Sequence, residues 1–123
     1  MKTSIIIAAP LEVVWKILVD THLWSSWGPS VNGVRCRDRF IQSGSKGNVR
    51  IALGIWIPFE ITDFVPEKRW SWRVMNIRAT GHRVEYLATK QCRLTFEVPW
   101  IAAPYLLICK IAARRIKLIA ESR

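Results

Sequence analysis

The chain has 123 residues, half of them hydrophobic and seven of them tryptophan, and its 19 basic and 9 acidic residues give a net charge of +10. This composition excludes an intrinsically disordered chain, and the length favours one domain over residues 1–123. No apolar run reaches the roughly 20 residues that span a bilayer, and Glu12 ends the first apolar run too early for a signal peptide. We therefore expect a cytoplasmic protein. The charge admits nucleic acid, an anionic membrane surface or acidic small molecules as partners and chooses none of them.

The first thirty residues predict a strand followed by two helices. Ile5–Ala8 is a short apolar strand, and Pro10 suits the first turn of the next helix, where its missing N–H would have no partner anyway. A polar break leads to a short helix or turn over Trp24–Trp27, which Gly28-Pro29 stops. The first helix carries apolar residues on one face at the i, i+3, i+4, i+7 spacing: Leu11, Val14, Trp15 and Leu18.

The middle of the chain predicts six strands joined by short turns. Alternating or β-branched and aromatic residues indicate strands at Val34–Phe40, Val49–Leu53, Ile57–Val65, Trp70–Ile77, His82–Thr89 and Cys92–Val98. Turns are expected at Ser43–Gly47, Pro66–Arg69 and Ala79–Gly81. Six consecutive strands with short turns should form an antiparallel meander with one face on a core and one toward water.

The C-terminal segment Trp100–Glu121 predicts one long helix. Pro104 fits a first helical turn, so the helix is expected to start near Ala102 or Ala103. Its apolar stripe should lie across the inner face of the sheet. The stripe consists of Ile101, Tyr105, Ile108, Ala112, Ile116 and Ile119, and the opposite face carries Lys110, Arg114, Lys117 and Glu121.

Several segments match one known family in their order along the chain. They are Ile5–Pro10 with the helix Leu11–Trp15, then Asp20, the Trp24–Pro29 turn, Gly47 opening a strand, Val65–Trp72 and the final helix. Together they resemble the START-like superfamily (SRPBCC), in its polyketide cyclase/dehydrase and lipid-transport branch. The resemblance covers essentially the whole chain and implies an α+β helix-grip fold. In this fold a curved antiparallel sheet of six to seven strands wraps around the long C-terminal helix, with two short helices after the first strand.

The resemblance also implies a cavity between sheet and helix for an apolar or amphipathic ligand. For the aromatic candidates, ordinary core packing is the alternative. A flanking arginine on the helix would either meet a ligand carboxylate or phosphate or lay its stem on the sheet edge. The candidate ligand-binding residues are Trp72, Tyr86, Phe96, Tyr105, Ile108, Ala112 and Arg115. Trp24, Trp27 and Trp56 lie in or beside predicted connections, and they form either the cavity mouth or plugs at the ends of the sheet.

The catalytic residues stay open. His82 follows Gly81 at a strand start, where it is either a proton donor or acceptor near a ligand carbonyl or a partly exposed turn histidine. Tyr86 is the second candidate. The strand acids show no pair that must converge on one substrate. Three separated cysteines (Cys36, Cys92 and Cys109) fit a reducing compartment, and with the histidines they give no metal spacing, so we expect neither metal nor cofactor.

Five arginines should point from the outer face of the sheet: Arg35, Arg37, Arg39, Arg50 and Arg93. They form either a solvated basic face or a site of attraction for an anionic membrane surface or an acidic partner; no nucleic-acid recognition motif is present. The leading hypothesis is binding or carriage of a small hydrophobic ligand. The alternatives are a cyclase/dehydratase-type enzyme and a basic interaction module. The apolar segment Ala103–Leu107 is either a cavity mouth or a dimer contact, so monomer and homodimer are both open.

Overall fold

The computed structural model describes all 123 residues, and its seven strands join in one antiparallel sheet of order β1-β7-β6-β5-β4-β3-β2. The strands are β1 (Lys2–Ile7), β2 (Gly33–Cys36), β3 (Lys46–Arg50), β4 (Trp56–Val65), β5 (Arg69–Val74), β6 (Ile77–Ala88) and β7 (Gln91–Glu97). The α-helices are α1 (Leu11–Val19), α2 (Trp24–Trp27) and α3 (Leu106–Glu121). Three 3-10 segments complete the chain: η1 (Thr21–Leu23), η2 (Ala52–Gly54) and η3 (Trp100–Tyr105).

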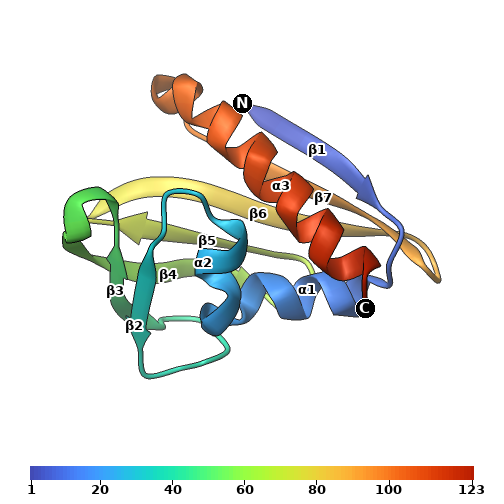
Figure 1. Cartoon of the computed structure of the whole chain (residues 1–123), viewed down its shortest axis with the longest axis horizontal. Coiled ribbons are helices and arrows are strands. Elements are labelled where there is room, and N and C mark those ends of the chain that lie inside the picture. The colour runs from blue at the N-terminus through green and yellow to red at the C-terminus, as the bar shows by residue number, and fades with distance from the viewer.

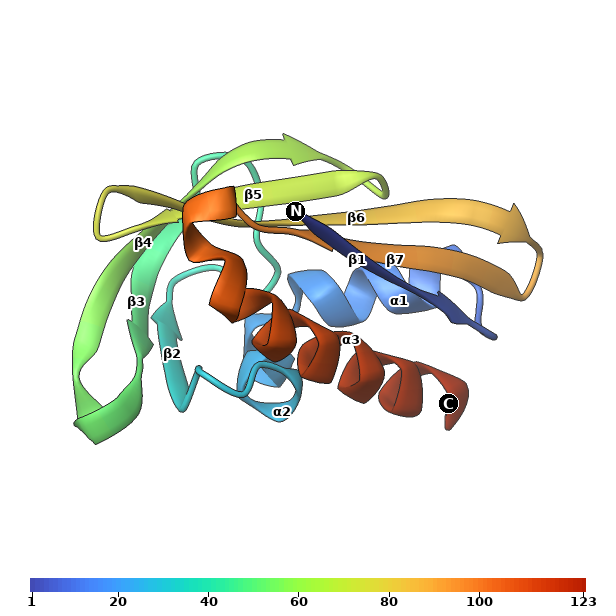
Figure 2. The same ribbon diagram turned by 90° about the horizontal axis from the view of Figure 1, so that it is seen from above.

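The sheet bends around α3, which lies across its inner face (Figure 1). Figure 2 shows that α1 and α2 lie on the same side of the sheet as α3. Register shifts between Ile61 and Phe64 in β4 and between Ser71 and Arg73 in β5 mark irregularities that bend the middle of the sheet. The α+β class and the helix-grip fold expected from the sequence are therefore confirmed.

One continuous apolar core fills the space between the helices and the sheet. The predicted apolar faces of α1 and of the strands point into it, because side chains alternate between the two sides of a strand. On α3 the fully buried positions are mostly small, which allows the helix to approach the sheet closely. These buried α3 residues are Cys109, Ala112, Ala113, Ile116 and Ala120.

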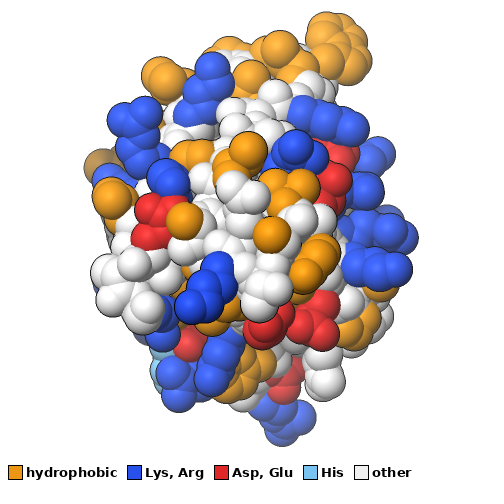
Figure 3. Space-filling view, turned by 90° about the vertical axis from the view of Figure 1, so that its right-hand side faces the viewer, with side chains coloured by type: hydrophobic (Ala, Val, Ile, Leu, Met, Phe, Trp, Pro, Cys, Tyr) orange, Lys and Arg blue, Asp and Glu red, His pale blue; other side chains and the backbone are white.

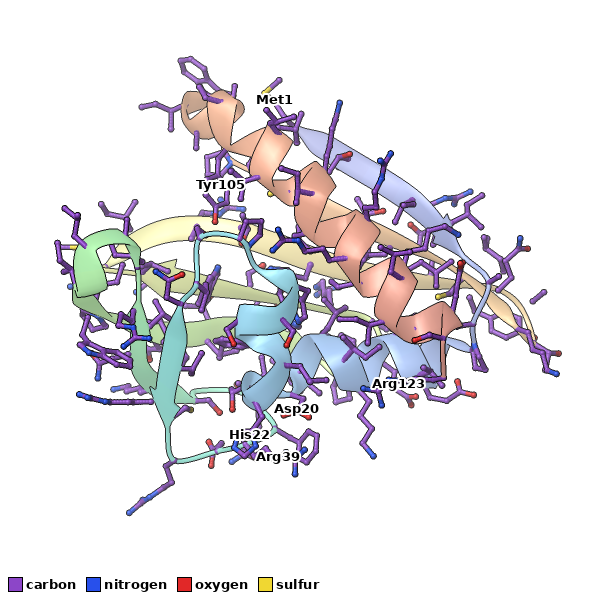
Figure 4. All side chains as sticks on the ribbon, viewed as in Figure 1. Met1, Asp20, His22, Arg39, Tyr105 and Arg123 are labelled. Carbon is purple, nitrogen blue, oxygen red and sulfur yellow. The ribbon has the colours of Figure 1, made fainter.

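A buried carboxylate ties the end of α1 to the segment that follows β2. Asp20 is 4% exposed, and its carboxylate accepts hydrogen bonds from Nε and Nη2 of Arg39, both at 3.2 Å. It also accepts a hydrogen bond from the backbone N–H of His22 at 3.0 Å, which caps η1. Figure 4 shows these three residues together, far from Tyr105 at the other end of the inner face. Asp20 is thus structural in this fold, and Arg39 is held in an ion pair with it.

Two strand ends differ from the sequence prediction. The predicted strand Val34–Phe40 ends at Cys36, because the chain turns away there to make the Asp20 contact. The predicted strand Trp70–Ile77 ends at Val74, and the turn falls at Met75 and Asn76 instead of Ala79–Gly81. Both turn residues have positive φ (53° and 61°), which is the backbone of a tight hairpin, and β6 then runs without interruption from Ile77 to Ala88.

The predicted helix Trp100–Glu121 and the predicted strand Val49–Leu53 also differ in their bounds. The α-helix begins at Leu106, and the expected start near Ala102 or Ala103 falls in η3, which is kinked at Ala102. Leu53, expected inside a strand, lies in η2 with φ 63° and 96% exposure. Both differences fall at the same end of the molecule, where the sheet extends beyond the α-helices (Figure 1).

Gly47 provides a test of this packing. A methyl group at Gly47 would overlap the backbone oxygen of Arg35 and lie 2.9 Å from the Phe59 ring. We predict that Gly47→Ala lowers the free energy of unfolding by about 2–3 kcal/mol, the usual cost of overpacking. Gly81→Ala is the matched control, because its nearest contact is the movable Ser71 hydroxyl at 3.2 Å. Urea denaturation that gave the two variants equal stability would contradict the strand pairing described here.

Candidate ligand-binding cavity

A cavity of about 520 Å³ lies between the inner faces of β3, β4 and β5, the loop after α2, and η3. A pocket of about 30 Å³ adjoins it under α2 and α3. Six residues line both spaces: Pro29, Ser30, Val31, Trp72, Thr80 and Tyr105. The remaining lining of the larger cavity is mostly apolar and includes Val49, Ile51, Ile57, Val74, Ile77, Val98, Pro99 and Ala102.

The cavity exists because the helices cover only part of the sheet. α3 starts at Leu106, so beyond that point only η3 faces the sheet, and its lining residues are Ala102 and Tyr105. Opposite them, Ile57 on β4 and Val74 on β5 point inward and are only half-buried. Apolar side chains that no helix covers therefore surround an open space, as in many ligand-binding sites.

A stack of three rings lines the small pocket that adjoins the larger cavity. Trp24 from α2 lies parallel to Trp70 with centroids 5.5 Å apart, and Trp70 lies on His82 at 3.8 Å. The indole Nε1–H of Trp24 donates to the carbonyl of Leu18 at 2.9 Å, which orients the ring from α1. Trp72 packs edge-on against Trp24 at 5.4 Å. The three stacked rings line only the small pocket, whereas Trp72 lines the larger cavity as well.

One chain of hydrogen bonds fixes the tautomer of His82. Trp72 Nε1 is only a donor, so its bond to Thr80 Oγ1 (3.0 Å) leaves the threonine hydroxyl to donate to His82 Nε2 (3.3 Å). His82 Nδ1–H then donates to the Trp70 carbonyl at 3.2 Å. Burial lowers the pKa of His82 to about 3 against the raising effect of this last bond, so the ring is neutral at neutral pH.

A second polar pair bridges the loop after α2 and the start of α3. The hydroxyls of Ser30 and Tyr105 are 2.5 Å apart, and both residues line the cavity. Burial raises the pKa of Tyr105, against the lowering effect of the Ser30 hydrogen bond, so the phenol stays protonated at neutral pH. The pair places a donor and an acceptor in a mostly apolar wall.

Burial keeps the one thiol that lines these spaces protonated at neutral pH. All three cysteines are free, and burial raises the pKa of Cys109, which lines the small pocket, to about 11. No group of three or more His, Cys, Asp or Glu side chains is placed to hold a metal ion. No Asp or Glu lines either space.

Most of the residues singled out from the sequence lie together at these two spaces. Trp72 and Tyr105 line both, whereas the small pocket is lined by Trp24, Trp27, Phe96, Ile108 and Ala112. His82 is there too, but it is 3% exposed and not the partly exposed turn histidine that was the alternative.

Three candidates lie elsewhere. Tyr86 is 66% exposed near the end of β6, where the strand extends past the core, and it lines neither space. Arg115 is exposed on α3. Trp56 lies on the outer face, with the Arg35 guanidinium 4.0 Å and that of Arg50 5.6 Å from its ring centroid.

Sequence reasoning missed Thr80, Ser30 and much of the wide cavity. The sequence predicts a turn at Thr80 because Gly81 follows it, whereas Thr80 belongs to β6 and shares the inner face with His82 two residues on. Asn76 was the available signal, since asparagine tolerates the positive φ that a tight hairpin needs. No sequence pattern marks Ser30, Ala52 or Ile77 as cavity residues. The cavity forms because α3 begins only at Leu106, and the sequence pattern does not predict that start.

The family model described as polyketide cyclase/dehydrase and lipid transport matches residues 1–117. The chain belongs to this family. Its fold is similar to that of the Zhui aromatase/cyclase from Streptomyces sp. R1128, with a TM-score of 0.75 at 14% identity over 100% of this chain and 93% of that one. No curated protein matches the chain.

Two further structures share the fold. Hypothetical protein jhp0584 from Helicobacter pylori gives a TM-score of 0.77 at 11% identity, covering 97% of this chain and 86% of that chain. The Aha1 dimer from Colwellia psychrerythraea gives 0.71 at 17% identity, covering 98% and 95%. Family and fold together support a hydrophobic ligand-binding domain of the polyketide cyclase/dehydrase type. None of its helices has the length and apolar character needed to cross a membrane.

The buried neutral state of His82 makes stability depend on pH. Unfolded His82 binds a proton as the pH falls below about 6.5, whereas the folded ring resists protonation down to about 3. The free energy of unfolding should therefore fall with pH in this window, by up to about 1.4 kcal/mol per pH unit. We predict that His82→Gln removes this slope between pH 6.5 and pH 5 in urea titrations, and that His22→Gln keeps it. Equal slopes in the two variants would show that His82 is not buried as described.

Proposed function

We propose that the protein binds a small hydrophobic or amphipathic ligand, lipid-like or polyketide-like, in the cavity of about 520 Å³. The observation that carries the proposal is this volume combined with an apolar lining that contains no carboxylate. Pockets for small organic ligands typically have roughly 300–1,000 Å³ and mostly apolar walls with a few placed polar groups. The cavity has a volume in this range and a mostly apolar wall with a few polar groups.

The positions of the polar groups suggest how an amphipathic ligand would lie. Its apolar part would pack on Ile57, Val74 and Trp72 along the inner face of the sheet. A carbonyl or hydroxyl could exchange hydrogen bonds with the Ser30–Tyr105 pair. Arg78 is exposed and lines the cavity, so an anionic group would find a cation there.

The ligand would enter through an opening that already exists. Ile77 lines the cavity and is also 69% exposed, and Ala52 is exposed as well, so the space reaches the surface. Entry without unfolding suits carriage of a ligand between sites. Location in the cytoplasm, where the three free cysteines would remain reduced, is part of this proposal.

A cyclase/dehydratase-type enzyme is the second candidate. Two hydrogen-bonded pairs that line the same cavity favour it: Ser30 with Tyr105, and Trp72 with Thr80. Such an enzyme would fold a flexible chain in the cavity and move protons with Tyr105, Ser30 or Thr80. The Zhui aromatase/cyclase shares the fold. Against this function, His82 has a pKa of about 3 with both ring nitrogens engaged, and no carboxylate is present to act as a base. Binding is therefore the better supported function.

Cavity filling tests the proposal. Nile red is a suitable probe because it is apolar and uncharged, so the net charge of +10 does not attract it to the surface. We predict saturable binding with enhanced fluorescence. Ile57→Trp, which enlarges a side chain in the cavity wall, should weaken binding by about tenfold or more, since the added ring occupies space that the dye would fill and reduces the area that the dye can bury.

The matched control is Ile6→Trp, the same substitution on a strand position that is 46% exposed on the outer side. It should leave Nile red binding unchanged, and circular dichroism should show both variants folded. Equal binding by Ile57→Trp and the unaltered protein would place the dye elsewhere and contradict the proposed site.

A further inference from the structure

Exposed apolar side chains surround the opening of the cavity, and they come from three segments far apart in the sequence. Leu53 and Ile55 belong to η2 and the residue after it, Met75 and Ile77 to the β5–β6 turn, and Trp100 and Ile101 to the start of η3. Their exposed fractions run from 51% for Ile55 to 96% for Leu53, with Trp100 and Ile101 both at 80%.

Each of these segments adjoins the cavity wall. Ala52, Val74 and Ala102 line the cavity, and each lies one or two residues from an exposed apolar side chain. In Figures 1 and 2 η2 and the β5–β6 turn lie at one end of the sheet, and the start of η3 (orange) lies beside that end. Figure 3 views the molecule from the opposite end and shows hydrophobic side chains gathered along its upper edge, the side where Figure 1 places η3.

The backbone gives independent evidence that two of these side chains are not there for stability. Leu53 and Met75 have φ of 63° and 53°, a region that glycine and asparagine occupy at lower cost. Both are also more than half exposed to water. Asparagine or glycine at these tips would relieve the backbone and remove apolar surface from water, so the observed residues stabilise neither the turn nor the isolated fold.

The charges around the opening favour an anionic partner. Arg78 lines the cavity, is exposed, and takes part in no ion pair. The wall itself contains no Asp or Glu, and the whole chain carries +10. Apolar tips beside an arginine that forms no ion pair, on a chain of net charge +10, match the composition of surfaces that insert into the interface of anionic bilayers.

We propose that this opening docks on an anionic lipid bilayer, with Leu53, Met75 and Trp100 inserted among the lipids. These three side chains surround the cavity opening and form no continuous apolar face. A fluid bilayer can fit around them, whereas an interface with a second copy of the chain needs a continuous, closely packed face. Trp100 suits the membrane interface, where tryptophan is enriched. Docking in this orientation turns the cavity toward the membrane. It goes beyond ligand binding and does not require it.

Vesicle flotation tests the docking surface. The protein should float with vesicles of phosphatidylcholine and phosphatidylglycerol, and added salt should weaken the association. The double variant Leu53→Asn/Met75→Asn keeps residues that tolerate positive φ, and it should lower the partition coefficient by about tenfold or more. Leu118→Gln is the control: Leu118 is 64% exposed on α3, far from the opening, and the change should have no effect.

Fluorescence quenching locates the contact. Brominated lipids should quench the protein's tryptophan emission, and Trp100→Phe should lose most of that quenching. Absence of flotation, flotation that the double variant does not weaken, or quenching unchanged in Trp100→Phe would each overturn the proposal. So would light scattering that showed a dimer which the double variant dissociates, because the tips would then contact a second copy. Nile red binding measured on the same double variant keeps this outcome separate from a failure of the ligand site.

Discussion

The stack of Trp24, Trp70 and His82 is the contact on which the rest of the structure depends. It joins α2 to β5 and β6, and through the bond from Trp24 to Leu18 it is fixed to the end of α1. Aromatic rings bury large apolar areas in defined geometries, so few other side chains could fill this place between a bent sheet and a short helix. The three rings line the small pocket that adjoins the larger cavity.

The same stack limits the chemistry available at the cavity. His82 is one of its rings, and a ring between Trp70 and Phe96 with both nitrogens engaged cannot exchange protons near neutral pH. The polar side chains left to a ligand are the hydroxyls of Ser30, Thr80 and Tyr105, the amide of Asn32, and Arg78. Hydroxyls orient a ligand by hydrogen bonds but need a base beside them to activate water or substrate. The cavity is therefore better suited to binding an apolar molecule than to catalysing its reaction.

Much of the fold could be predicted from the sequence, because periodicity and order are local properties. The apolar stripe of the C-terminal helix and the alternation in strands such as Cys92–Val98 predict an antiparallel sheet with the helix across its inner face, and the resemblance to a known family implies the helix-grip fold. The cavity could be predicted only in part. Trp72 and Tyr105 point inward by alternation and helical spacing, but the width of the cavity depends on the start of α3 at Leu106 and on a hairpin at Met75-Asn76. Both are set by tertiary packing, as is the position of Trp56 on the outer face between two arginines.

The most direct test of the central claim is a ¹H–¹⁵N NMR titration with 2-naphthol, a small neutral aromatic. The Trp72 indole N–H and the backbone amides of Ile57 and Val74 should shift together with one dissociation constant, because all three residues line the same cavity. The indole of Trp56, on the outer face, should stay in place and serves as an internal reference. Shifts at Trp56 without shifts at Trp72, Ile57 and Val74 would contradict a ligand site between the sheet and the C-terminal helix.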